Sequence, residues 1–258
     1  MAALVEHEAR WSSQSRARTG RMAKRAAAPV LVALLLGGVL VWVSAIELDS
    51  IEARTLNTTY VVARIREHLT LTVAASLLVA LLAIPVGILV HRTPSKVVRS
   101  VVLALANVGQ ATPAVGVVIL LAILWRTGFA TALVALVAYS FLPVLRNTIA
   151  GLEQVEASIR ESAKGMGLTA RQVLWRIEFP LASPVILAGL RTSLVFCVGV
   201  ATIATFINAG GLGDMIVNGL KLQRYPVLVV GAVLVASIAI LIDWVAGLVE
   251  ERLRPKGL

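Results

Sequence analysis

Six long apolar runs constrain the fold of this 258-residue chain more than any other feature. They lie at about Pro29–Ile46, His68–Val90, Val97–Trp125, Phe129–Arg146, Leu181–Asn208 and Pro226–Val249. Each run is close to or above the length of about 20 residues that a helix needs to cross a bilayer. Only 15% of the residues are charged, which is too few to cover the surface of a soluble domain of this size. The sequence therefore predicts an all-α membrane protein with about six transmembrane helices.

Two of the apolar runs contain residues that disturb a helix. Gly109, Pro113 and Gly116 fall in the third run, so we expect that run to bend or break near its middle. Pro85 and Gly87 predict a kink in the second run.

Basic residues predict the orientation of the chain. Of 24 Lys and Arg residues, 17 lie in the two tails and in the connections after the second and fourth runs, against 6 in the other connections. Because positively charged loops stay in the cytoplasm, we expect a multi-pass protein with both termini cytoplasmic. The net charge of +10 is then a consequence of topology, and we expect no binding to nucleic acid.

The same arguments divide the chain into four parts. We expect a disordered basic cytoplasmic tail (1–28), the first transmembrane helix with its extracytoplasmic connection (29–67), a membrane-spanning core domain (68–250) and a second cytoplasmic tail (251–258). The basic start, the apolar run and Val43-Ser44-Ala45 also fit a cleavable signal peptide. The apolar run is long for a signal peptide, which favours a retained helix, but both readings stay open.

A polar segment, ESAKGMGLTARQVLWRIEFP (Glu161–Pro180), follows the fourth run on the predicted cytoplasmic side. Ser158–Glu161 and Thr169–Gln172 both fit the capping box that starts a helix. Gly165 and Gly167 suit a helix end in the left-handed region. The pattern predicts two short helices around a glycine turn.

The spacing in this segment resembles the EAA loop of permease subunits of bacterial ABC importers. The residues that match or lie within the pattern are Glu161, Ser162, Ala163, Lys164, Gly165, Gly167, Ile177 and Pro180. The chain departs from the pattern at Ser162, where the family has alanine, and at Phe179, where it has leucine. The resemblance implies the type I ABC importer permease fold, with this loop as a coupling helix that docks on a separate ATP-hydrolysing subunit.

From His68 to Arg254 the chain resembles the osmoprotectant branch of that family. The resemblance is carried by Gly109–Val118, Leu142–Leu152, Leu181–Ser193 and Thr205–Ile216. It implies import of glycine betaine, carnitine, choline or a similar quaternary ammonium compound across the bacterial cytoplasmic membrane. Methionine or another amino acid is the alternative cargo, and an osmotic channel that needs no ATPase is the alternative of another class.

The resemblance also implies the partners and cofactors. These are two copies of an ATPase subunit, a second permease subunit (the same or a related chain) and an extracytoplasmic substrate-binding protein. ATP and Mg would be bound by the ATPase, because this chain has no Gly-x-x-x-x-Gly-Lys-[Ser/Thr] loop. Its three histidines form no metal-binding spacing, so we expect no metal site and no enzymatic activity.

Polar residues beside bent backbone are the candidates for the solute pathway. They are Gln110, Thr112, Pro113, Asn147, Asn208, Gly210 and Gly211. Non-helical backbone at membrane depth is tolerated only where protein buries it or where it lines a cavity. The alternative, that Gln110 and Asn147 only form hydrogen bonds between helices, stays open.

Two ionisable residues inside the predicted runs, Arg191 and Asp243, need an explanation, because charge in the hydrocarbon region is costly. We expect a structural role, either as an ion pair or as separate anchors at the cytoplasmic interface. Recognition of quaternary ammonium usually needs aromatic faces. The few aromatic residues here are scattered, so we expect capture of the solute by the separate binding protein.

Overall fold

The computed structural model describes residues 26–253, and the chain divides into two compact units, Met1–Glu47 and Leu48–Leu258. In the first unit the described part is one apolar helix, Ala26–Ser44, which is long enough to cross a membrane. The prediction of a disordered tail over residues 1–28 lies almost wholly outside the described residues, as does most of the predicted tail over 251–258.

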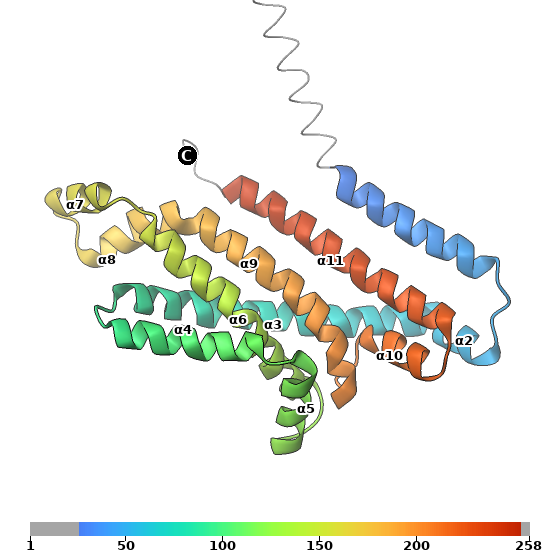
Figure 1. Cartoon of the computed structure of the whole chain (residues 1–258). Coiled ribbons are helices and arrows are strands. Elements are labelled where there is room, and N and C mark those ends of the chain that lie inside the picture. The colour runs from blue at the N-terminus through green and yellow to red at the C-terminus, as the bar shows by residue number, and fades with distance from the viewer. Residues whose placement is uncertain (1–25, 254–258) are drawn as a thin grey trace, which may run out of the picture. The chain divides into compact units, whose positions relative to one another are not determined.

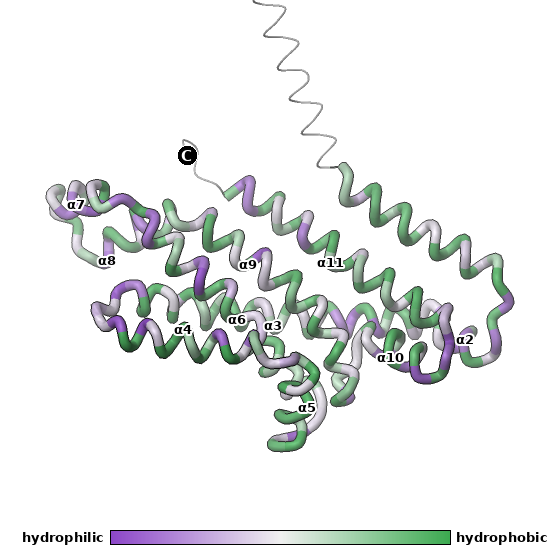
Figure 2. The backbone as a smooth tube through the Cα atoms, in the orientation of Figure 1, coloured by the Kyte–Doolittle hydropathy of each residue, from purple (hydrophilic) through white to green (hydrophobic). Residues whose placement is uncertain are grey.

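The second unit is built from helices throughout its described part (Figure 1). They are α2 (Ser50–Thr55), α3 (Thr58–Arg92), α4 (Lys96–Ala111), α5 (Ala114–Leu124), α6 (Phe129–Glu153), α7 (Ala157–Gly165), α8 (Ala170–Val173), the π-helical turn η1 (Leu174–Glu178), α9 (Phe179–Ala201), the 3-10 turn η2 (Thr202–Ile207), α10 (Gly213–Lys221) and α11 (Tyr225–Leu253). The long helices run beside one another, with α7 and α8 at one end of this unit and α2 and α10 at the other. Figure 2 shows hydrophobic residues along the long helices and hydrophilic residues along α7.

The described helices agree with the six apolar runs. Five are long and apolar enough to span a membrane, and α4 with α5 makes a sixth span if the bent pair is counted as one. These two helices meet at 99° across Thr112 and Pro113, which confirms the predicted break. Proline lacks the N–H that a continuous helix would need at this point. In contrast, α3 continues through Pro85 without interruption.

Two predicted helix limits were wrong because helices continue through charged residues. The second span begins at Thr58 and not at His68, since the Asn57 side chain caps it by accepting a hydrogen bond from the Tyr60 N–H (2.9 Å). The fourth span continues past Arg146 for seven more residues to Glu153. Charge at these positions therefore does not mark the end of a helix.

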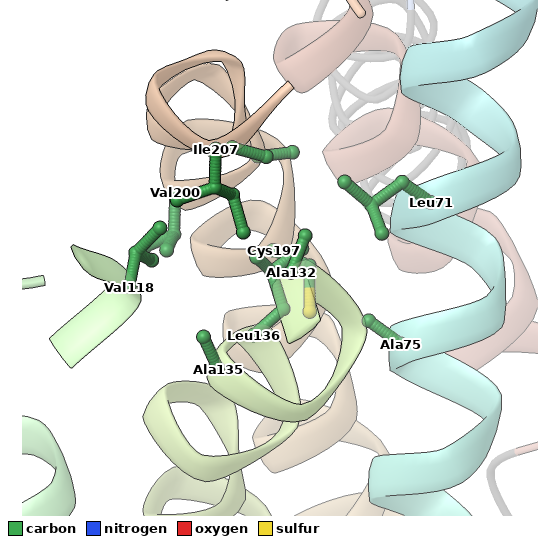
Figure 3. Close-up of a cluster of buried hydrophobic side chains, with 11 residues drawn as sticks. Leu71, Ala75, Val118, Ala132, Ala135, Leu136, Cys197, Val200 and Ile207 are labelled. Atoms are coloured by element: carbon green, nitrogen blue, oxygen red, sulfur yellow. The ribbon is translucent and has the colours of Figure 1, made fainter. Parts of the chain in front are cut away.

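Helix α6 forms the centre of the second unit, because it packs against both α3 and α9. In Figure 3, Leu71 and Ala75 of α3 point toward Ala132 of α6 and Cys197 of α9, and Val118 of α5 approaches from the other side. Small residues bring these helices close together, as expected for association in a membrane. A Cβ added to Gly189 of α9 would lie 2.5 Å from the Asn147 Cβ of α6.

Candidate coupling segment and solute pathway

The segment that resembles the EAA loop folds as two short helices, α7 and α8, joined by a glycine turn; we call residues 157–173 the coupling segment. Gly167 has a φ of +84° and donates its N–H to the Lys164 carbonyl (2.9 Å). The Leu168 N–H donates to the Ala163 carbonyl (3.2 Å), which completes the helix end. The left-handed turn predicted at Gly167 is thus confirmed, whereas Gly165 is the last residue of α7.

One of the two predicted capping boxes is present. At the start of α8, the Gln172 N–H donates to the Thr169 hydroxyl (3.4 Å), and the Thr169 N–H donates to the Gln172 side chain (2.8 Å). The box predicted at Ser158 was wrong. Helix α7 begins two residues earlier than that box predicts, directly after Glu156, and the Ser158 hydroxyl donates to the Glu156 carboxylate (3.1 Å).

The coupling segment presents its polar residues outward. Glu161, Ser162 and Lys164 are exposed, whereas Ala163 is buried. Nothing lies within 4 Å of a Cβ added at Gly165 or Gly167. Of the α7 residues carried over from the EAA pattern, all except Ala163 are therefore exposed. Ile177 and Pro180, also carried over, lie apart from them in η1 and α9.

Two charged residues that the sequence analysis did not single out fasten the coupling segment to the bundle. Arg92, the last residue of α3, donates from Nη2 to the Ala170 carbonyl (2.8 Å). The same nitrogen lies 3.6 Å from the Glu178 carboxylate, whose side chain is only 8% exposed. In the sequence, Arg92 is one of several basic residues at the end of an apolar run, and nothing there identifies its partners.

Three pathway candidates, Gln110, Thr112 and Pro113, lie at the break between α4 and α5, whereas Asn147 lies on α6. Thr112 closes α4 with its hydroxyl donating to the Val108 carbonyl (2.8 Å), and Gln110 is half-buried one turn from Asn107. Asn147 donates to the Pro143 carbonyl of its own helix (2.8 Å) and faces Gly189 on α9. Asn147 therefore has a packing role at the α6–α9 contact.

The remaining candidates form the turn between η2 and α10. Asn208, Gly210 and Gly211 all have positive φ angles (58°, 77° and 94°). The Gly211 N–H donates to the Glu67 carboxylate of α3 (2.9 Å). A Cβ at Gly211 would lie 3.2 Å from Nδ1 of His68, which is fully buried beneath it. Glycine at this position therefore lets the turn lie directly against α3.

Charged groups join this turn to α3. Arg64 lies 2.6 Å from Asp214 of α10 and 3.0 Å from Glu67 of its own helix. The Thr205 hydroxyl donates to the same Asp214 carboxylate. We call these residues and Gly211 the α3–α10 polar cluster. It ties η2, the following turn and the start of α10 to α3.

An ion pair of Arg191 and Asp243, one of the two alternatives that the sequence left open, is present between α9 and α11. Arg191 donates from Nε and Nη2 to the two carboxylate oxygens of Asp243 (2.5 and 2.7 Å). Its Nη1 also lies 3.6 Å from Glu250, two turns further along α11. Between residues 26 and 253, no group of three or more His, Cys, Asp or Glu side chains is placed to hold a metal ion.

Residues 83–255 match the family described as "Binding-protein-dependent transport system inner membrane component". The chain belongs to this family. Several curated relatives support this family assignment. The choline transport system permease protein OpuBB of Bacillus subtilis is 40% identical over 74% of this chain and 88% of its own length. The osmoprotectant import permease protein OsmY of Salmonella typhimurium is 36% identical over 90% of this chain and 96% of its own length.

Solved structures show the same fold for this family member. The inward-facing MetNI methionine ABC transporter matches with a TM-score of 0.67 and 21% identity over 75% of this chain and 96% of that chain. A bacterial alginate ABC transporter matches with a TM-score of 0.65 and 16% identity over 95% and 99%. The predicted ABC importer permease fold and the resemblance to the osmoprotectant permeases are thus confirmed.

Proposed function

We propose that this chain is the membrane subunit of an ATP-driven importer of osmoprotectants, taking up a quaternary ammonium compound such as glycine betaine, carnitine or choline. The observation that carries the proposal is the similarity over nearly full length to an osmoprotectant import permease. Carnitine permeases of Listeria monocytogenes, at up to 39% identity, support the same class of cargo.

The coupling segment supports a separate ATPase as the source of energy. Its exposed α7 surface, with Glu161 beside small residues, suits close docking into a groove of another protein. Two ATPase subunits would bind ATP and Mg, and this chain would itself be neither an enzyme nor a cofactor-binding protein. Closure of the ATPases would move the coupling segments together. Arg92 and the π-helical turn would carry that motion into α3 and α9.

The other partners follow from the same proposal. A second permease, identical or related, would complete the solute pathway, and an extracytoplasmic binding protein would capture and deliver the solute. The orientation proposed from the distribution of Lys and Arg puts both termini and the coupling segment in the cytoplasm.

Methionine or another amino acid is the competing cargo. It is supported by fold similarity at 21% identity, whereas permeases named for osmoprotectants are 36–40% identical. The rival of another class, an ATPase-independent osmotic channel, fits less well with a family described as binding-protein-dependent.

Uptake into proteoliposomes tests the proposal. The chain is reconstituted with its ATPase and binding protein, and uptake of labelled glycine betaine, carnitine, choline and methionine is measured with and without ATP. We expect ATP-dependent uptake of at least one quaternary ammonium compound. Uptake of methionine alone would favour the competing cargo, and uptake without any ATPase would favour the channel.

A matched pair of variants tests the coupling segment. Gly167→Arg strains a turn with positive φ on the proposed docking surface, and we expect it to abolish uptake and co-purification of the ATPase. Gly116→Ala, on α5 where an added Cβ meets nothing within 4 Å, is the control and should retain both. Normal uptake by Gly167→Arg would contradict docking at this turn.

A further inference from the structure

Arg146 is a charged side chain on an apolar helix, and its visible partner is neutral. Its Nη2 donates to Oδ1 of Asn107 on α4 (2.7 Å). Arg146 forms no ion pair with any residue in the described part of the chain. Its side chain is exposed on the surface of this chain. A guanidinium in this setting keeps most of its N–H donors available.

An ion pair on the same two helices shows how deep Arg146 lies. Arg99 of α4 and Glu153, the last residue of α6, pair at 2.5 Å. Asn107 lies eight residues beyond Arg99, and Arg146 lies seven residues before Glu153. At 1.5 Å per residue, both helices place the Arg146–Asn107 contact about 10–12 Å further into the bundle. This depth is within the hydrocarbon region if the Arg99–Glu153 pair lies near the membrane surface.

Two other arginines inside the long helices have carboxylate partners, whereas the exposed Arg66 of α3 forms no ion pair among the described residues. Arg191 is paired with Asp243 and Glu250, and Arg64 with Asp214 and Glu67. Ionisable residues within membrane helices face a bundle interior or a water-filled cavity and mark the paths of ions and substrates. An arginine that meets an amide in place of a carboxylate is therefore suited to an anionic group that is not part of this chain.

The surroundings of Arg146 fit a site on a pathway. No residue of α4, which is described from end to end, is buried by the rest of the chain. Gln110 lies one turn from Asn107 on α4, and the break at Thr112 and Pro113 follows directly. A break in a helix at membrane depth is tolerated only where protein buries the backbone or where the backbone lines a cavity, and not where it faces lipid. Arg146, Asn107 and Gln110 thus line a polar strip that leads to the break.

We infer that Arg146 binds the carboxylate of a zwitterionic solute during its passage, with Asn107 as the residue that positions the guanidinium. The inference rests on the proposed import of osmoprotectants and predicts that carboxylated compounds are transported in preference to choline. A guanidinium matches a carboxylate with two parallel hydrogen bonds. Choline carries a hydroxyl in place of the carboxylate and has a net positive charge, so the same guanidinium repels it.

Glycine betaine and choline make a matched pair of probes, because they share the trimethylammonium group and differ at the other end. The complete transporter in proteoliposomes is given each labelled compound, and kcat/KM for ATP-dependent uptake is measured. The binding protein is the same in every sample, so its own preference cancels when each variant is compared with the unaltered transporter.

We expect Arg146→Gln to lower the ratio of kcat/KM for glycine betaine to that for choline by about tenfold or more, as loss of a charge-assisted hydrogen bond implies. Asn107→Ala should lower the same ratio by about threefold, because the guanidinium stays but is less well oriented. The control is Arg99→Gln, which removes a cation from the same helix pair outside the polar strip and should leave the ratio unchanged.

Parallel loss of both activities in Arg146→Gln and Asn107→Ala would overturn the inference, since it is the result of a purely structural role. An unchanged ratio would overturn it as well. If Arg146→Gln does not assemble, the ratio in Asn107→Ala decides. Failure of the unaltered transporter to import any quaternary ammonium compound would refute the proposed function instead, so the two failures are distinguishable.

Discussion

Loss of Arg191 should destabilise the protein more than loss of Asp243, although the two side chains pair with each other. In Asp243→Asn, the guanidinium keeps Glu250 as a second carboxylate. In Arg191→Gln, Asp243 is left without an ion pair among the described residues. Asp243 lies ten residues before the end of α11, within the apolar part of that helix.

The expected size of each loss follows from the cost of charge in a membrane. An aspartate at the centre of a membrane helix costs about 2.5–3.5 kcal/mol, and a hydrogen bond between helices contributes about 0.6 kcal/mol on average. We expect Arg191→Gln to lower the free energy of unfolding by about 2–3 kcal/mol and Asp243→Asn by about 1 kcal/mol. The double variant carries no unpaired charge at this pair and should lose less than the sum.

Reversible unfolding in mixed detergent micelles, followed by tryptophan fluorescence, measures these differences. Arg176→Gln, which removes an exposed cation of η1, is the control for the change in net charge and should have little effect. Equal losses in the two single variants, together with an additive double variant, would refute the reasoning from the unpaired carboxylate.

Two further predictions use matched pairs of positions. Gly189→Ala should lower the free energy of unfolding by about 1–3 kcal/mol, because the added Cβ would lie 2.5 Å from the Asn147 Cβ. Gly199→Ala is the control and should be nearly neutral, because nothing lies within 4 Å of its added Cβ. Equal melting temperatures for the two variants would contradict this reasoning. Thr169→Ala should cost about 1 kcal/mol and speed amide hydrogen exchange in the first turn of α8, whereas Ser158→Ala should not loosen α7 because Ser158 does not cap it. Loss of protection in α7 alone would reverse that assignment.

Local patterns in the sequence predicted those features that depend on neighbouring residues. The apolar runs predicted the membrane spans, and Pro113 predicted the break between α4 and α5. The spacing around Gly167 predicted the left-handed turn after α7. The cost of charge at membrane depth pointed to the Arg191–Asp243 pair, which joins residues 52 apart, as one of two alternatives.

Features that depend on tertiary partners were missed. Arg146 was taken as the end of a span because a lone charge usually marks the membrane surface, and its hydrogen bond to Asn107 on another helix could not be read from the sequence. Arg92 was counted for topology alone, although it holds both Ala170 and Glu178. At Ser158 the pattern was correct for a capping box, but Glu156 provided the start of the helix instead.

The continuous helical segment from Ala170 to Ile207, in which α8, η1, α9 and η2 follow one another, has a mechanical consequence. Its 38 residues make a rod about 57 Å long, with the coupling segment at one end and the Asn208–Gly211 turn at the other. A tilt of one degree about the first end moves the second by about 1 Å. The Gly211–Glu67 hydrogen bond is 2.9 Å long, and at about 3.6 Å it would no longer exist. A rotation of about a degree would therefore strain this hydrogen bond, while the Arg64–Asp214 ion pair also holds α10 to α3.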